Sequence, residues 1–116
     1  MLEQKNVLAL AFVGDAYHSL RVRTGLVASG DEKVAKLHQI AANVVCAKAQ
    51  AQTFNRIKDK LTQTEADIAN RARNAKHHTM PKNCSPAEYR DATALEALIG
   101  FWFLSDNEQR YNEVME

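Results

Sequence analysis

The chain has 116 residues, of which 46% are hydrophobic and 25% are charged, with 15 Lys and Arg against 14 Asp and Glu. This length suits one domain over residues 1–116 with a core of its own, and only four glycines and two prolines argue against a disordered or turn-rich all-β chain. No stretch has the pattern of a secretory signal or is apolar for long enough to cross a membrane, so we expect a cytoplasmic protein. Cys46 and Cys84 form no C-x-x-C pair and are expected to be free thiols.

The spacing of apolar residues predicts helices and no strand, and hence an all-α fold. The expected helices span residues 6–28, 32–60, 62–75, 85–104 and 106–114. Asp31 and Asp106 are candidate caps of the second and the last helix. The pair Thr62 and Glu65 has capping-box spacing, and Ser85 followed by proline predicts the start of the fourth helix.

Two acidic residues stand alone in apolar helical runs: Asp15 within residues 8–20 and Glu96 within residues 92–104. A carboxylate taken out of water is costly unless it is paired, hydrogen-bonded or bound to a metal ion. Two buried carboxylates that converge without a basic partner indicate a hard divalent cation. The alternative is that Asp15 is an ordinary polar residue after Gly14 and that Glu96 faces water.

The basic residues are most concentrated between residues 71 and 82. This stretch contains Arg71, Arg73, Lys76, Lys82, His77 and His78, and no acid. Such a cluster is usually a solvated surface, and the alternative is a strip that contacts phosphate groups.

Metal-assisted hydrolysis of a phosphodiester would use both features, because a cation activates water while the basic strip holds the polyanion. Nucleophilic catalysis is poorly supported, since no nucleophile elbow is present and Cys46 lies within an expected helix. A zinc site from His77, His78 and Cys84 is disfavoured, because adjacent histidines point in different directions and no second Cys pair completes a tetrahedron.

Several segments resemble a known family. Residues 10–16, LAFVGDA, are similar to the signature helix of the ribonuclease III catalytic domain, and residues 94–100, ALEALIG, to its second acidic segment. Residues 73–76, RNAK, and 81–83, PKN, lie between them, and Tyr89-Arg90 leads into the second. Together they resemble the bacterial Mini-ribonuclease III subfamily, which lacks a double-stranded RNA-binding domain. The resemblance covers almost the whole chain and implies a helical domain of five or six helices.

The resemblance implies that Asp15 and Glu96 are the catalytic, metal-binding carboxylates. Ala11 and Thr93 stand where standard ribonuclease III has a glutamate and an aspartate. The subfamily shares both departures, which leave open how many metal ions bind. The expected ion is Mg²⁺, with Mn²⁺ as a substitute, because Mg²⁺ keeps several waters and needs few protein ligands.

The implied activity is endonucleolytic cleavage of structured, double-stranded RNA in the maturation of the large-subunit (23S) ribosomal RNA precursor. Arg71, Arg73, Lys76 and Lys82 are the expected phosphate contacts, and His77 and His78 add charge below neutral pH. The alternative function is a catalytically inactive helical module that binds RNA or protein, which the two missing acids allow.

A duplex has two strands, and one carboxylate cluster cuts only one of them, so a two-fold homodimer is the simplest working unit. By resemblance, Phe12 inserts into a socket on the other subunit, and the two active sites lie at either end of a shared groove. The alternative is that Phe12 belongs to the core of its own chain.

Overall fold

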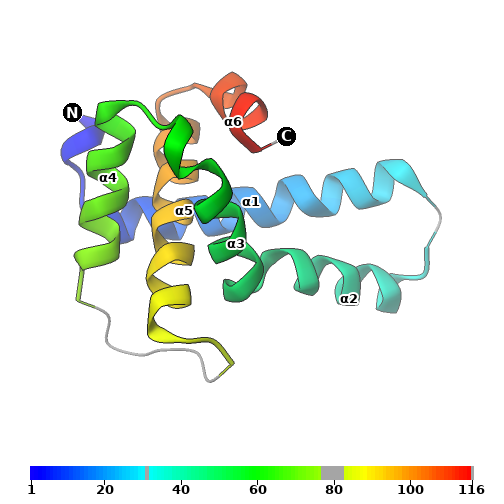
Figure 1. Ribbon diagram of the computed structural model, residues 1–116. Helices are drawn as coiled ribbons and strands as arrows, with labels where there is room; N and C mark the ends of the chain where they lie inside the picture. The colour runs from blue at the N-terminus through cyan, green and yellow to red at the C-terminus, as the bar shows by residue number, and fades with distance from the viewer. Residues whose placement is uncertain (31, 77–82, 116) are drawn as a thin grey trace.

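The computed structural model describes residues 1–30, 32–76 and 83–115, and over these ranges the chain is all-α, as predicted (Figure 1). Its α-helices are α1 (Val7–Ser29), α2 (Val34–Val45), α3 (Ala47–Ile57), α4 (Gln63–Asn74), α5 (Pro86–Leu104) and α6 (Glu108–Met115). Short 3-10 turns, η1 (Leu2–Gln4) and η2 (Lys58–Lys60), precede α1 and follow α3. No helix within these ranges is long and apolar enough to span a membrane.

α5 is the central helix, and α1, α3 and α4 pack around it (Figure 1). Residues 92–100 are buried apart from Glu96, as expected for a helix that is apolar on all sides. The Ser85 side chain accepts a hydrogen bond from the Glu88 amide, and the Glu88 carboxylate accepts one from the Ser85 amide. This capping box, followed by Pro86, sets the beginning of α5 where the sequence predicts it.

α1 and α5 cross with their backbones in contact. A Cβ atom at Gly14 would lie 1.7 Å from the carbonyl oxygen of Glu96, and one at Gly100 would lie 1.9 Å from the carbonyl oxygen of Leu10. These distances exclude any side chain, so the crossing requires glycine on both helices. The close approach places Asp15, the neighbour of Gly14, beside Glu96.

The second half of α1 packs on α2, and this pair of helices projects from the rest of the molecule (Figure 1). Apolar side chains are exposed along it, including Leu20, Val27 and Val34. The α1–α5 crossing lies away from this projecting pair of helices (Figure 1).

The single long helix predicted over residues 32–60 is wrong. The helix is interrupted at Cys46, whose φ of −66° and ψ of 157° correspond to an extended backbone. α2 and α3 are therefore separate helices. Gln50 Nε2 donates a hydrogen bond to the Val45 carbonyl oxygen at 2.9 Å, which satisfies a carbonyl that the broken helix leaves without its backbone donor. The predicted cap at Asp31 lies outside the described residues.

The last helix begins at Glu108, two residues after the predicted start. Asp106 has a φ of 58°, in the left-handed region that commonly follows the end of a helix, and therefore cannot cap α6. The Asn107 side chain accepts a hydrogen bond from the Arg110 amide at 3.3 Å instead. The prediction of Asp106 as the cap is wrong by one residue.

Candidate active site

The structure brings Asp15 of α1 and Glu96 of α5 together. Their carboxyl groups lie close enough for Asp15 to act directly on the ionisation of Glu96. Burial and then Asp15 raise the pKa of Glu96 to about 8, while the side chain of Gln50 acts in the opposite direction. Two carboxylates this close cannot both ionise at low cost, so the pair retains a proton unless a positive charge replaces it.

The two carboxyl groups differ in exposure. Asp15 is exposed and Glu96 is half-buried, so the expectation that both are buried is wrong for Asp15. Gly14 faces α5, and the next residue lies about 100° further round the helix, which turns Asp15 towards solvent. The pair is consequently held by the protein on one side and open to ions and substrate on the other.

The donor set fits a hard divalent cation. Within residues 1–30, 32–76 and 83–115, no group of three or more His, Cys, Asp and Glu side chains is arranged to hold a metal ion. Asp15 and Glu96 would therefore supply two oxygen ligands, and water or phosphate oxygens would complete the shell. Mg²⁺ suits such a site, because it releases its waters reluctantly and is commonly bound through one or two carboxylates.

Neighbouring positions add no acidic ligand. Ala11 and Thr93, which replace the acids of standard ribonuclease III, are both buried. The Thr93 hydroxyl donates to a backbone carbonyl one turn earlier, at 2.9 Å. His18 is also buried, with Nδ1 2.9 Å from the Tyr111 hydroxyl, and burial lowers the pKa of His18 although Asp15 opposes the shift. Its imidazole is therefore neutral at pH 7.

Gln50 of α3 is a site residue that sequence reasoning missed. Its side chain is almost fully buried and lies beside Glu96, whose pKa it lowers, while its Nε2 donates to the Val45 carbonyl oxygen. The two interactions fix the direction of the amide. One signal was present in the sequence: Gln50 lies within the apolar stripe that includes Ala51 and Phe54, where a polar residue needs a partner.

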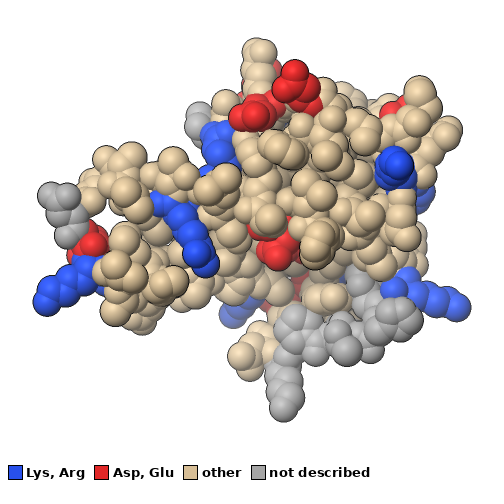
Figure 2. Space-filling view, turned by 180° about the vertical axis from the view of Figure 1, so that it is seen from behind, with Lys and Arg blue, Asp and Glu red and all other residues tan. Residues whose placement is uncertain are grey.

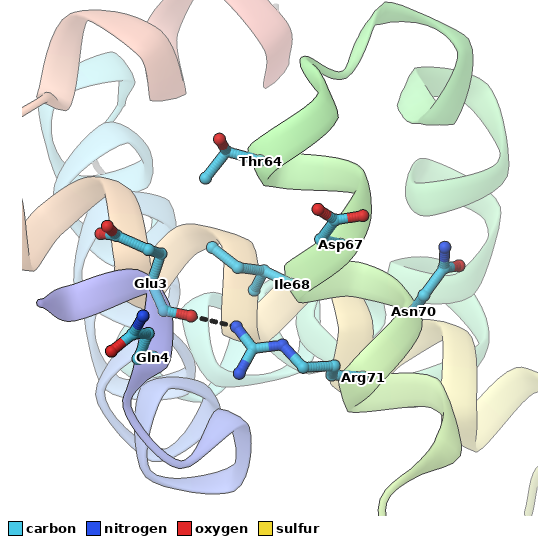
Figure 3. Close-up of a pocket in the computed structure, with 7 residues that line it drawn as sticks. All are labelled: Glu3, Gln4, Thr64, Asp67, Ile68, Asn70 and Arg71. Carbon is cyan, nitrogen blue, oxygen red and sulfur yellow. Dashed lines mark hydrogen bonds between the residues drawn. The ribbon is translucent and has the colours of Figure 1, made fainter.

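Arg71 reaches towards the N-terminus of the chain. Its guanidinium donates a hydrogen bond to the backbone carbonyl of Glu3, at one side of a cavity of about 540 Å³ between η1 and α4 (Figure 3). Glu3 and Asp67 line the same cavity. Arg71 is exposed, but acidic groups share its surroundings.

The other residues of the predicted basic strip have different environments. Arg73 Nε donates to Asp91 Oδ1 at 2.7 Å, whereas Lys76 is exposed just after α4. Lys82 and residues 77–78 lie outside the described residues. Figure 2 shows that Lys and Arg side chains stand apart from one another on the face opposite to that of Figure 1.

Phe12 is 82% exposed on α1, one turn before Asp15. The alternative that Phe12 is a core residue of its own chain is therefore wrong. A large aromatic ring in this position is available to another molecule and lies next to the carboxylate pair.

Comparisons with known proteins agree with this geometry. A family model described as "Ribonuclease III domain" matches residues 8–107. A protein from Thermoanaerobacter sp. (strain X514) named Mini-ribonuclease 3 is 43% identical over 94% of this chain and 77% of its own length. A Staphylococcus aureus protein of the same name is 42% identical over 95% of this chain and 84% of its own length.

A solved structure has the same fold. The crystal structure of a protein from Fusobacterium nucleatum superimposes with a TM-score of 0.89 and 33% identity, covering 97% of this chain and 89% of that one. The helical architecture, the match over residues 8–107 and the identity to the Mini-ribonuclease 3 proteins lead to one conclusion. This chain belongs to the ribonuclease III family.

Proposed function

We propose that Asp15 and Glu96 are the catalytic, metal-binding residues of this chain, an endoribonuclease of the ribonuclease III type that acts on double-stranded RNA. The observation that carries the assignment is the contact between the two carboxyl groups at the α1–α5 crossing. Backbone contact at Gly14 and Gly100 fixes the positions on α1 and α5 from which the two side chains project.

The ribonuclease III family depends on divalent metal ions. We assign Mg²⁺ to this site, with Mn²⁺ as a substitute, because both are hard cations that accept carboxylate and water ligands. When bound, the ion supplies a Lewis acid that activates water and neutralises charge on the phosphate. Asp15 would hold it from the exposed side and Glu96 from the buried side, while Gln50 keeps the Glu96 carboxylate directed at Asp15.

We assign the contacts with the RNA phosphates to four basic residues: Arg71, Arg73, Lys76 and Lys82. Double-stranded RNA is recognised mainly by its shape, its phosphates and its 2′-hydroxyls, so basic side chains that can reach the phosphates are the required groups. Lys76 is the exposed member with no described partner, and Arg73 is held by Asp91.

The working unit is assigned as a two-fold homodimer with Phe12 at its interface. The exposed ring of Phe12 supports this assignment, because a second copy of the chain would bury it. Two copies also provide two carboxylate pairs, one for each strand of the duplex.

The natural substrate is assigned as the precursor of large-subunit (23S) ribosomal RNA, processed in the cytoplasm. This rests on the identity to the Mini-ribonuclease 3 proteins and on the chemistry of the site, which suits any structured RNA with a duplex segment.

Cleavage of an end-labelled RNA duplex tests the proposal. We expect cleavage with Mg²⁺ or Mn²⁺, none with a chelator, and none of the single strand alone. The competing function is a catalytically inactive module that binds RNA or protein, which Ala11 and Thr93 would permit. Duplex binding without cleavage at any metal concentration would establish that module and overturn the enzyme.

A further inference from the structure

The packing of α3 on α5 forms a second polar cluster, at Asn55 and Asp91, between the same two helices that bring Gln50 to Glu96. Gln50 contacts Glu96, and Asn55, five residues later on α3, contacts Asp91, five residues earlier on α5. Five residues of α-helix rise by about 7.5 Å. The Asp91 cluster therefore lies between one and two helical turns before Glu96 along α5.

The second cluster is a continuous chain of hydrogen bonds. Lys58 Nζ donates to Asn55 Oδ1 at 3.1 Å, and Asn55 Nδ2 donates to Asp91 Oδ2 at 2.9 Å. The other oxygen of Asp91 accepts from Arg73 Nε at 2.7 Å. Asp91 is buried, while the Arg73 side chain is 41% exposed. The buried carboxylate thus holds the guanidinium through Nε, while the side chain as a whole remains partly exposed.

A cavity of about 180 Å³ opens at this cluster between α3, α4 and α5, and both Lys58 and Arg73 line it. Their two positive charges exceed the one negative charge of Asp91, so the cluster retains a positive charge. Asn70 in the same wall supplies a further polar group. A polar, positively charged hollow next to a phosphodiester-cleaving site suits an anion of the size of a phosphate group.

We propose that Lys58 and Arg73 bind one backbone phosphate of the RNA near the bond that is cut, with Asp91 and Asn55 as the positioning residues. The proposal rests on the proposed function, because it takes duplex RNA as the ligand. Asp91 acts through Arg73: it fixes the guanidinium so that binding does not have to order a free side chain.

The two possible roles of Asp91, positioning Arg73 or only neutralising its charge, predict opposite changes in RNA affinity when Asp91 is replaced. If Asp91 only cancels the charge of Arg73, then Asp91→Asn makes the surface more positive and tightens RNA binding. If Asp91 positions Arg73, the same variant weakens binding although it removes a negative charge. Asp67→Asn is the matched control, since Asp67 is an exposed acid on α4 that belongs to a different cavity.

The experiment measures the affinity for a fluorescently labelled RNA duplex at several salt concentrations, without divalent metal so that the duplex stays intact. We expect Asp91→Asn to bind about tenfold more weakly, the effect of losing a charge-assisted hydrogen bond. Arg73→Ala should weaken binding and reduce the salt slope by about one. The double variant should bind no more weakly than Arg73→Ala, and Asp67→Asn should bind at least as well as wild type.

Equal or tighter binding by Asp91→Asn would overturn the proposal, as would a lower melting temperature with unchanged affinity. If Asp91→Asn does not fold, Asn55→Ala replaces it and should weaken binding in the same direction, with unchanged binding counting against the proposal. Wild-type protein that neither binds nor cuts the duplex would refute the proposed function as well. Normal wild-type cleavage with unaffected variants would refute only the phosphate site.

Discussion

The Glu96 carboxyl retains a proton near neutral pH because burial and the neighbouring Asp15 both oppose its ionisation. A metal ligand must be deprotonated, so Mg²⁺ binding has to displace this proton. We therefore predict that the affinity for Mg²⁺, measured by calorimetry, rises between about pH 6 and pH 8 and levels off above the pKa of about 8. An affinity that does not change over this range would contradict the shared-proton account.

The stability of the metal-free protein should change in the opposite sense. The folded-state pKa of Glu96 is raised above the ordinary 4.5, so the folded protein keeps a proton that the unfolded chain has already lost. Stability consequently falls as the pH rises from about 4.5 to about 8. Saturating Mg²⁺ should remove this loss, because it stabilises the ionised pair.

Gln50 gives a prediction about how Glu96 is oriented. Gln50→Leu keeps a side chain of similar size but removes the amide that contacts Glu96, and partners of metal ligands typically contribute roughly tenfold or more to metal affinity. We predict a Mg²⁺ affinity about tenfold weaker, with folding retained by circular dichroism. Gln52→Leu is the matched control, since Gln52 is exposed on the same helix and should leave metal affinity unchanged.

The sequence identified some of these residues and missed others for a physical reason. Asp15 and Glu96 were recognisable because each is a lone acid in an apolar run. Gln50 and Asp91 acquire their partners only when α3, α4 and α5 pack, and residue type alone does not specify that packing. Asp15 also proved exposed, because a run of apolar neighbours in sequence does not fix which side of α1 faces α5.

At the scale of the helices, the α1–α5 crossing depends on glycine. Gly14→Ala would place a methyl group against the Glu96 backbone, so α1 and α5 must move apart, and we predict a loss of about 3 kcal/mol in unfolding free energy. Gly25→Ala on the same helix meets nothing within 4 Å and should stabilise by about 1 kcal/mol. Chemical denaturation measures both. Equal effects of the two substitutions would show that the close crossing is not required.

Helix ends were predictable where side chains mark them. The Thr62–Glu65 and Ser85–Glu88 capping boxes locate α4 and α5 within a residue. The break between α2 and α3 has no proline or glycine to mark it in the sequence. The Gln50 side chain donates to the Val45 carbonyl in place of the missing backbone donor. A bond of that kind depends on the folded geometry, which is why periodicity predicted one continuous helix.

At the scale of the whole molecule, Phe12 gives a test of assembly. Phe12→Glu places a charge where an apolar partner surface is proposed, so we predict monomers in light scattering, or an unfolded chain if the dimer is obligate. Cleavage of both strands should be lost in either case. Phe12→Leu keeps an apolar side chain and should retain the dimer. Monomeric wild-type protein at micromolar concentration, with duplex cleavage intact, would refute the homodimer.

The central claim is that the carboxylate pair at the helix crossing performs the metal-dependent chemistry. The most direct measurement is the rate at which Glu96→Gln cleaves a labelled RNA duplex at saturating Mg²⁺. The substitution preserves shape and removes the negative charge, so we predict a rate at least about a hundredfold lower. This loss exceeds the one typical of a residue that contacts a metal ligand without binding the metal itself. The metal-free variant should remain folded and should bind the duplex. A folded Glu96→Gln protein that cleaves at a rate close to that of wild type would contradict the assignment.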